Sequence, residues 1–331
     1  AQSLAGLITR SRNVLIMGHK NSDLDSFGAS LAAARIVENL GKKANIVIDY
    51  ESLEEKTKGV VEMLRSNPDY KGLMLTISEA LEKANKNTLL ISVDNHKDSL
   101  AISRSVLDKV KNKVIIDHHR RSEEFISSPV LTYLEPSASS TVELLVELFD
   151  YQQHEIEISS LDATIMYTGM LVDTNYFRQH VGTRTFQSAA KLKEAQADLS
   201  LAYELLEDSF ECMKEIFDIT ESAYRYKDKF LIATGKDEEL SRSTLAKAAN
   251  QLVYVSGIYA AFAIGYISKN TVAISARSSK KVNVQMIMEN DALHGGGHFS
   301  MAACQIENVT IEEAKERLEH AIDAYLEDRG V

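Results

Sequence analysis

The chain of 331 residues contains only two cysteines, Cys212 and Cys304, and only three prolines. Two cysteines cannot build a disulfide framework or a cysteine zinc site, and their scarcity fits a reducing cytoplasm. No stretch approaches the roughly 18 to 20 consecutive apolar residues of a membrane span, and no segment resembles a signal peptide. These absences argue against a disulfide-stabilised secreted domain and against a membrane span within this sequence.

Positive charge is also scarce, because 37 Lys and Arg face 48 Asp and Glu and the formal net charge is −11. Such a chain lacks the basic surface that grips the phosphates of long nucleic acids and the basic patch that binds an anionic membrane. Its 44% hydrophobic and 26% charged content is typical of a folded, soluble protein. The length predicts about two domains, and the expected partners include neither long nucleic acid nor a membrane surface.

Short β-branched runs alternate with amphipathic helical patterns through the first half of the chain. The helical patterns include 26–40, which ends at Gly41, and 99–111. The run Ser140-Thr141-Val142-Glu143 has the sequence of a capping box ahead of a helix that ends near 149. This alternation predicts a mainly parallel sheet covered by helices on both faces. The expected strands are 13–17, 44–49, 88–94, 113–117 and 130–134.

The second half begins with helical periodicity from 158 to 226, interrupted near 174–182 and near 198. We interpret its later part as helices that connect two domains. A smaller α/β domain is expected to follow, with a last helix that starts at Ile311. Its expected strands are 229–234, 259–268, 271–277 and 301–306, and a helix is expected near 282–289. The predicted fold class is α/β throughout.

Histidines and aspartates gather at the ends of three predicted strands and of one predicted helix. Because the carboxyl ends of parallel strands open on one side of a sheet, these clusters should meet there. Taken singly, Asp23 or Asp25 predicts only the N-cap of the following helix, and a lone histidine predicts a structural residue. The coincidence of four clusters favours a functional site. The residues are His19, Asp23 and Asp25, then Asp94, then Asp117, His118 and His119, and finally Asp173.

Carboxylates that are brought together repel, and cations between them relieve this repulsion. Four of the aspartates carry a charge of about −4, which two divalent ions would neutralise. Imidazole mixed with carboxylate favours Mn²⁺ over Mg²⁺ or Ca²⁺, with Co²⁺ or Fe²⁺ as possible substitutes. Two such ions form the usual clamp for displacement at phosphorus. The residues alone therefore predict a two-metal site for a phosphoryl compound.

A second group of residues suits an anion. His294-Gly295-Gly296-Gly297-His298 would allow the backbone to approach a ligand closely and to present N–H groups to it. Arg277, within 275–279 at a predicted strand end, supplies a guanidinium fork that can hold a phosphate. A flexible turn and a surface arginine are the alternatives for either feature alone.

These motifs together resemble the DHH phosphoesterase superfamily with its DHHA1 companion domain. The resemblance covers nearly the whole chain. The run 19–25 and Asp117-His118-His119-Arg120-Arg121 are most similar to the catalytic module of the membrane-anchored cyclic-di-AMP phosphodiesterases of Gram-positive bacteria. Stand-alone oligoribonucleases of the superfamily usually read Pro-Asp-Gly-Asp-Ala in the first motif. Ser22 stands where the family commonly has proline, and no ligand atom is lost by this change.

The resemblance implies a role for each residue of the first site. His19 and Asp23 would bind one metal ion, and Asp94 would bridge both ions. Asp117 would orient a ligand, and His119 would face the substrate phosphate. The residues implied as ligands of the second ion are Asp25, His118 and Asp173. The implied catalytic residues are Asp94, Asp117, His118 and His119. Outside this set, His96 is interpreted as a polar loop residue, with a residue that supports a metal ligand as the alternative. Arg178 and Arg184 are interpreted as surface residues or phosphate contacts.

The resemblance also assigns the remaining parts of the chain. Residues 1–190 would form the DHH catalytic domain, 191–224 a helical connector and 225–331 the DHHA1 domain, with the active site in the cleft between the two domains. The implied substrate-binding residues are His119, Arg277, Ser278, Gly295, Gly296, Gly297 and His298.

The implied activity is manganese-dependent hydrolysis of cyclic-di-AMP to 5′-pApA by a water that two metal ions activate. The chain would be the cytoplasmic domain of a membrane-anchored protein and would form a homodimer. Three alternatives stay open. They are an oligoribonuclease or pApA exonuclease, a pyrophosphatase or exopolyphosphatase, and a nucleotide-binding regulatory module without turnover.

Overall fold

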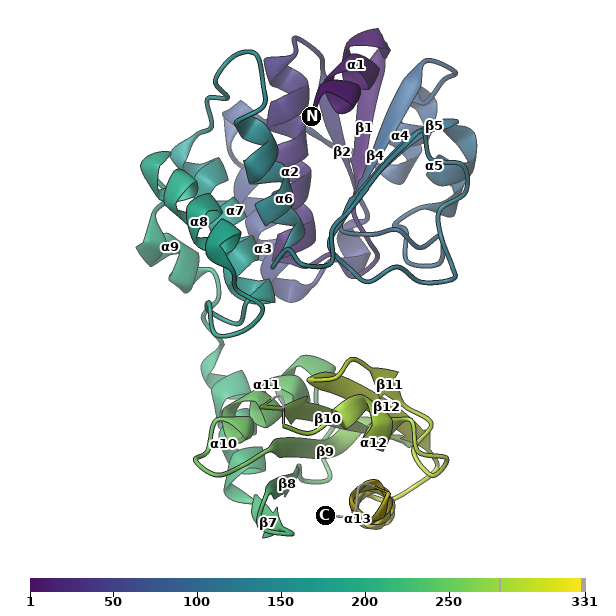
Figure 1. Cartoon of the computed structure of the whole chain (residues 1–331), viewed down its shortest axis with the longest axis vertical. Coiled ribbons are helices and arrows are strands. Elements are labelled where there is room, and N and C mark those ends of the chain that lie inside the picture. Colours follow the sequence, from purple (N-terminus) through teal and green to yellow (C-terminus); the bar gives the residue numbers. More distant parts are fainter. Residues whose placement is uncertain (280, 329–331) are drawn as a thin grey trace. The chain divides into compact units, whose positions relative to one another are not determined.

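The fold is taken from a computed structural model that describes residues 1–279 and 281–328 (Figure 1). The chain divides into two compact units, Ala1–Glu207 and Asp208–Val331. The division falls inside the segment that the sequence assigns to a helical connector. Each unit is built around its own sheet with its own hydrophobic core. Among the described residues, no helix is long and apolar enough to cross a membrane.

The N-terminal unit contains a six-stranded sheet in which all pairings are parallel, with the order β3-β2-β1-β4-β5-β6. The parallel sheet and five of its strands were predicted, each strand to within one residue at either end. The short β3 was not predicted, because three residues carry too little periodicity to identify a strand. The strands are β1 (Asn13–Met17), β2 (Ala44–Ile48), β3 (Met74–Thr76), β4 (Thr88–Val93), β5 (Asn112–Asp117) and β6 (Leu131–Leu134).

Helices cover both faces of this sheet, as the continuous apolar strands require. On one face, residues of α4 (Ile77–Lys83) and α5 (Arg104–Lys109) pack against β1, β4 and β5. The larger core on the other face includes the helices around α2 in Figure 1. These are α1 (Gln2–Arg10), α2 (Leu24–Asn39), α3 (Glu55–Arg65), α6 (Thr141–Phe149), α7 (Ser160–Asp173), α8 (Thr183–Glu194) and α9 (Leu199–Glu204), and two 3₁₀ turns are η1 (Tyr50–Ser52) and η2 (Pro68–Tyr70).

The predicted capping box of α6 is present only in part. The Ser140 hydroxyl accepts a hydrogen bond from the backbone N–H of Glu143, as a cap does. The Glu143 carboxylate does not return to the backbone of Ser140, but accepts hydrogen bonds from Ser139 and Thr185 instead. The helix start is thus correct, and the glutamate serves to hold α8 against α6.

The C-terminal unit contains a second six-stranded sheet with the order β11-β12-β10-β9-β8-β7, in which β8 and β9 pair in parallel and the other neighbours pair antiparallel. The end of the predicted helical segment is wrong, because 224–226 forms the edge strand β7. The glycine run is also not a simple turn, since two of its residues form β11. The strands are β7 (Tyr224–Tyr226), β8 (Phe230–Thr234), β9 (Ala260–Ser268), β10 (Thr271–Ser278), β11 (Gly296–Gly297) and β12 (Met301–Glu307).

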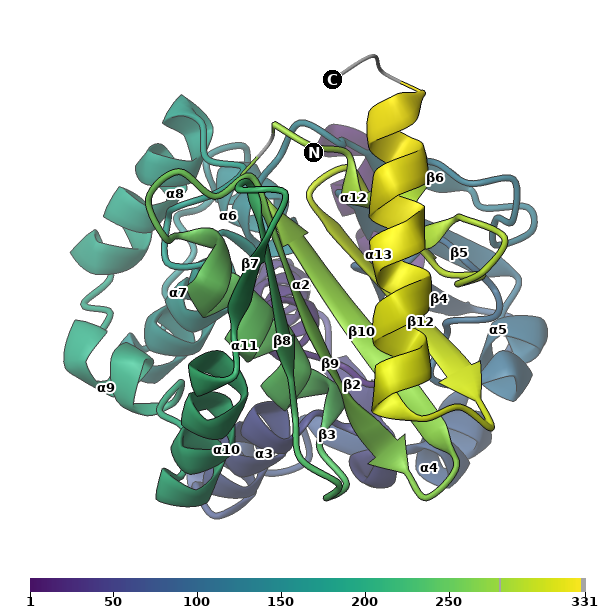
Figure 2. The same ribbon diagram turned by 90° about the horizontal axis from the view of Figure 1, so that it is seen from below.

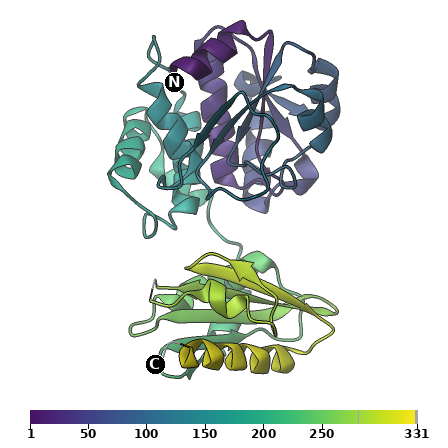
Figure 3. The same ribbon diagram turned by 45° about the vertical axis from the view of Figure 1, so that its right-hand side comes forward.

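Helices lie on the two faces of the second sheet. The cores place α12 (Val284–Met288) and α13 (Ile311–Glu327) on one face, and α10 (Phe210–Glu221) and α11 (Arg242–Val253) on the other. Figures 2 and 3 show α13, in yellow, running along the sheet. The strands alternate between the faces, so that Ala273 belongs to the core beneath α11 and Ile274 to the core beneath α13. The helix α11 was not predicted, and it proves important for the second site.

Candidate metal centre and anion-binding cavity

The predicted histidines and aspartates do meet at one edge of the parallel sheet. His19 follows β1, Asp94 follows β4, and 117–119 ends and follows β5, while β1, β4 and β5 are neighbours in the sheet. The strand order changes direction between β1 and β4, and ligands of open α/β sheets bind at such a switch point. Asp173 joins the group as the last residue of α7.

The two aspartates after β1 each support a helix start as well. An oxygen of Asp23 accepts a hydrogen bond from the Ser26 N–H and caps α2. Asp25 is fully buried, and its two oxygens accept the N–H groups of Thr141 and Val142 at the start of α6. Each carboxylate oxygen has about two acceptor positions, so these bonds still leave lone pairs for a cation.

Asp94 occupies the centre of the site. One of its oxygens, Oδ2, lies 3.2 Å from His19 Nε2. The other, Oδ1, lies 3.6 Å from His118 Nε2 and accepts the Thr141 hydroxyl at 2.8 Å. Its backbone has a φ of 56°, a left-handed conformation that costs on the order of 1 kcal/mol and is concentrated at functional sites. The carboxylate of Asp94 thus presents its two oxygens to two different histidines.

Three overlapping groups of residues could hold a metal ion, with ligand atoms within 4.8 Å of one another. In the group of Asp94, His118 and His119, the Nδ1 atom of His119 is not available to a metal ion, because it hydrogen-bonds to Asp117 Oδ1 at 2.8 Å. Two positions therefore remain, one on either side of Asp94. The groups are His19, Asp23 and Asp94; Asp25, His118 and Asp173; and Asp94, His118 and His119.

The hydrogen bonds of two histidines fix the ring nitrogen that each presents to the site. His19 Nδ1 lies 2.6 Å from the carbonyl oxygen of Lys20, and His118 Nδ1 lies 3.3 Å from that of Ala138. A carbonyl only accepts, so Nδ1 carries the proton in both rings, as in most metal-binding histidines. Nε2 of each ring faces carboxylate oxygens, and the buried Nε2 of His118 lies 3.0 Å from an oxygen of Asp173.

Electrostatics also favour a cation here. Burial, together with the charges of Asp94 and Asp173, raises the pKa of Asp23 to about 7, and burial raises the pKa of Asp25 well above its usual value. Burial lowers the pKa of His19, but the hydrogen bond and charge of Asp94 outweigh this and raise it to about 10. Positive charge is thus strongly stabilised between the carboxylates. The donor types, their burial and their tautomers fit divalent metal ions at both positions.

His119 belongs to a different arrangement, a chain of hydrogen bonds through Asp117. Asp117 Oδ1 accepts from the N–H and Nδ1 of His119, and Oδ2 accepts from His96 Nδ1 at 2.5 Å. The backbone N–H of Ser122 donates to His96 Nε2, so the His96 proton is on Nδ1. Burial raises the pKa of Asp117, but the hydrogen bonds from His119 and His96 hold it below its usual range.

These hydrogen bonds decide between the two interpretations of His96 and identify the partners of Asp117. His96 does lie in a loop, but it is 1% exposed and hydrogen-bonds to the fully buried Asp117, so the alternative of a supporting residue describes it better. The position of His96, two residues after Asp94, was the signal for this alternative. Asp117 contacts His119 and His96 and not the predicted metal ligand His118. Among the two arginines considered for phosphate, Arg184 forms an ion pair with Glu147 in the part of the chain that the structure describes.

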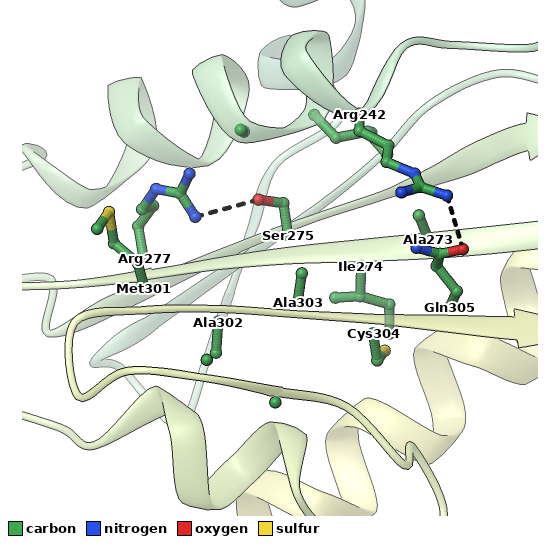
Figure 4. Close-up of a pocket in the computed structure, with 14 residues that line it drawn as sticks. Arg242, Ala273, Ile274, Ser275, Arg277, Met301, Ala302, Ala303, Cys304 and Gln305 are labelled. Atoms are coloured by element: carbon green, nitrogen blue, oxygen red, sulfur yellow. Dashed lines mark hydrogen bonds between the residues drawn. The ribbon is translucent and has the colours of Figure 1, made fainter. Parts of the chain in front are cut away.

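The second site is a cavity of about 410 Å³ in the C-terminal unit, bounded by α11, β10, β11 and β12. Figure 4 shows its two arginines, Arg277 with a bond to Ser275 and Arg242 with a bond to Gln305. Of the predicted substrate-binding residues in this unit, Arg277, Gly296 and Gly297 line the cavity. Its size is in the ordinary range of small-molecule sites.

Arg277 is a half-buried cation whose partners are all neutral. Its Nε donates to Asn250 on α11, and its Nη1 donates to Ser275 and to the carbonyl oxygen of Ala276. Among the described residues, no carboxylate pairs with it, and burial lowers its pKa to about 10. A desolvated guanidinium without an acidic partner is well suited to an anion that comes from outside the protein.

The glycines of the motif differ in what they do. A Cβ on Gly295 would lie 2.6 Å from the Ala303 oxygen, and one on Gly297 would lie 2.4 Å from the Met301 oxygen. The close approach of β11 to β12 therefore requires both glycines. The N–H of Gly295 donates to the carbonyl oxygen of Met288 and is used within the protein. Gly296 has nothing within 4 Å of its Cβ position and opens onto the cavity.

Three predicted substrate contacts are not among the residues that line this cavity. Ser278 is buried, and its hydroxyl donates to the carbonyl oxygen of Val282 at 2.6 Å. Gly295 packs against the backbone of Ala303 and Met288, and His298 is exposed, with its N–H bonded to the carbonyl oxygen of Met301. Ser275, two residues before Arg277, is the serine that lines the cavity.

Comparison with known proteins identifies two family domains in the chain. The family model described as "DHH family, N-terminal domain" matches residues 13–170, and the "DHHA1 domain" matches 227–328. The chain is 38% identical over 330 residues to the cyclic-di-AMP phosphodiesterase GdpP of Bacillus subtilis, covering 99% of this chain and 50% of that protein. It is 40% identical over 326 residues to the cyclic-di-AMP phosphodiesterase PdeA of Listeria monocytogenes, covering 98% and 49%.

The fold has a counterpart among solved structures. An exopolyphosphatase-related protein from Bacteroides fragilis superposes with a TM-score of 0.81 at 20% identity, covering 98% of this chain and 97% of that one. At this identity the likeness shows the fold alone. The chain spans about half the length of the two curated relatives above. It belongs to the DHH family, and consists of an N-terminal DHH domain followed by a DHHA1 domain.

Proposed function

We propose that this chain is a metal-dependent phosphodiesterase that hydrolyses cyclic-di-AMP to 5′-pApA with two Mn²⁺ ions. One observation carries the proposal: His19 Nε2 and His118 Nε2 face opposite oxygens of the Asp94 carboxylate. The mixed imidazole and carboxylate donors favour Mn²⁺, with Co²⁺ or Fe²⁺ as substitutes. The proposed metal ligands are His19, Asp23, Asp25, Asp94, His118 and Asp173.

When bound, two divalent ions supply a water of lowered pKa and neutralise charge on the reacting phosphate. The chain's own residues position the reactants. Asp94, held by Thr141, fixes the spacing of the two positions. His119 is 48% exposed, and its Nδ1 is held by Asp117, so its Nε2 side is available to a phosphate oxygen or to the leaving oxygen. Such a donor stabilises charge that develops during bond cleavage.

Two further observations support a cyclic dinucleotide as the substrate. Both curated relatives described above are called cyclic-di-AMP phosphodiesterases. Arg277 gives the C-terminal unit a phosphate site beside a cavity of nucleotide size, while the net charge of −11 disfavours a long polyanion. We therefore assign bond cleavage to the N-terminal unit and nucleotide binding to the C-terminal unit.

The test is product analysis by chromatography after incubation of the full chain with Mn²⁺ and cyclic-di-AMP, cyclic-di-GMP or pApA. The wild type should convert cyclic-di-AMP to 5′-pApA. Asp94→Asn should abolish turnover, while Asp108→Asn, an exposed control on α5, should not change it. Full activity of Asp94→Asn would contradict the bridging role. Cleavage of pApA alone would favour an oligoribonuclease, and binding without turnover a regulatory module.

We also propose that the chain forms a homodimer and is the cytoplasmic part of a membrane-anchored protein. Phe210 and Phe217 support self-association, because they lie on one side of α10 and are 78% and 63% exposed. Light scattering after gel filtration should give a mass twice that of one chain, and Phe217→Lys should lower the measured mass. A wild-type monomer at micromolar concentration would contradict the dimer.

A further inference from the structure

The floor of the cavity in the C-terminal unit is a row of cross-strand pairs from β10 and β12. Side chains of one strand alternate between the two faces of a sheet, and every second residue of β10 from Ala273 faces α11. The floor therefore runs from a cationic end to an amide end. The pairs along it are Arg277 with Met301, Ser275 with Ala303, and Ala273 with Gln305.

The middle of this floor is almost bare of side chains. Ser275 and Ala303 are small, and Gly296 of β11 lies beside Ala303 as the next residue across the sheet. Leu245 and Ala246 of α11 form a wall along the same cavity. A flat floor of small residues beside an apolar wall accommodates a planar ring better than a branched or bulky group.

The far end of the cavity carries the side-chain amide of Gln305, which is hydrogen-bonded to Arg242. Arg242 Nη2 donates to Gln305 Oε1 at 2.9 Å, as Figure 4 shows. Arginine has no acceptor, so this bond decides which way the Gln305 amide points. Its oxygen keeps a second lone pair, and its NH₂ group supplies two donors. Gln305 therefore presents an acceptor beside a donor in a set orientation.

The spacing of the two ends matches one nucleotide. Gln305 lies across from Ala273, which is four residues before Arg277, so the two ends are about 13 Å apart along the strand. A phosphate at Arg277 would place its sugar over Ser275 and its base towards Gln305.

We propose that Gln305, oriented by Arg242, reads the base of the nucleotide whose phosphate binds Arg277, and that it selects adenine. This inference rests on the proposed function and names the specificity of the same substrate. Glutamine pairs with the N6 and N7 positions of adenine through one accepted and one donated bond. Guanine has two acceptors, O6 and N7, at this edge, and its O6 would face the glutamine oxygen.

The experiment measures kcat and KM of the full chain with Mn²⁺ on cyclic-di-AMP and cyclic-di-GMP. Gln305→Ala should raise KM for cyclic-di-AMP about tenfold, the loss expected for one bidentate base contact, with little change in kcat. KM for cyclic-di-GMP should stay the same. Arg242→Met removes the hydrogen bond that orients the Gln305 amide, and it should reduce the preference for adenine less than Gln305→Ala does. Glu307→Ala, an exposed control on the same strand outside the cavity lining, should behave as wild type.

Two readouts separate this inference from the proposed function. Bis(p-nitrophenyl) phosphate has no base, so Gln305→Ala should hydrolyse it at the wild-type rate. Calorimetric titration with AMP and GMP tests base selection without turnover, and Gln305→Ala should weaken AMP binding alone. Equal effects on the adenine and guanine ligands, or no effect, would overturn the inference while hydrolysis stands. A wild type inactive on cyclic dinucleotides would refute the proposed function, and the AMP titration would still decide the role of Gln305.

Discussion

Gly169 of α7 lies against the start of α2, where a side chain would not fit. A Cβ at this position would lie 2.6 Å from the Leu24 oxygen and 3.0 Å from the Asp25 Cα. Asp173 lies one helical turn later on the same side of α7. Gly169→Ala should therefore separate the two helices at the point where Asp25 and Asp173 approach each other.

The size of the effect follows from two opposing contributions. Alanine favours a helix interior by about 1 kcal/mol over glycine, whereas overpacking a tight contact typically costs about 1–3 kcal/mol. The net result should be a loss of about 1 kcal/mol in the free energy of unfolding. Gly59 in α3 provides the matched control, because it is exposed and has nothing within 4 Å of its Cβ position. Gly59→Ala should therefore gain about 1 kcal/mol.

The assay is urea unfolding of both variants without metal, followed by titration of Mn²⁺ into the folded proteins. Gly169→Ala should be less stable than Gly59→Ala and should bind Mn²⁺ more weakly, because Asp25 and Asp173 are displaced. Equal stability of the two variants, or unchanged Mn²⁺ binding by a destabilised Gly169→Ala, would refute the argument that this contact sets the geometry of the second position.

The other predictions concern three polar contacts. His96→Leu leaves the buried Asp117 carboxylate short of one hydrogen bond, so it should lower the free energy of unfolding by about 1–3 kcal/mol and reduce kcat. His96→Asn retains a donor and should restore part of the stability and of kcat. Equal kcat values for His96→Leu and the wild type would contradict the role of His96. Arg35→Met leaves Asp162, which is 1% exposed, without its ion pair, and thermal unfolding should show a loss of about 3 kcal/mol. Arg277→Gln should raise KM for cyclic-di-AMP and leave hydrolysis of bis(p-nitrophenyl) phosphate unchanged. A loss of activity on both substrates would indicate a structural role.

The sequence was sufficient to predict the parallel sheet and the meeting of its strand-end residues. The strands β1, β4 and β5 each contain a continuous apolar run, and a parallel sheet necessarily brings the carboxyl ends of such runs to one edge. Asp94 could therefore be expected near His19 and His118 without knowledge of side-chain positions. The left-handed backbone of Asp94 could not be expected, since it results from packing around the site.

Contacts between distant residues were beyond the sequence patterns. His96 bonds to Asp117 across 21 positions, and Arg242 bonds to Gln305 across 63. Neither pair has a local periodicity that would reveal it. The glycine motif predicted that Gly295 contacts the substrate, but Gly295 is required by the close packing of its backbone against Ala303. The sequence pattern does not distinguish a glycine required by packing from one required by ligand binding.

The two-metal site can be tested by a crystal structure of the Mn²⁺-bound chain with anomalous scattering measured at the manganese edge. Two anomalous peaks are expected, one on each side of the Asp94 carboxylate. The first should lie beside His19 and Asp23, and the second should lie among Asp25, His118 and Asp173. A single peak, or a peak that Asp94 does not contact, would contradict the two-metal site.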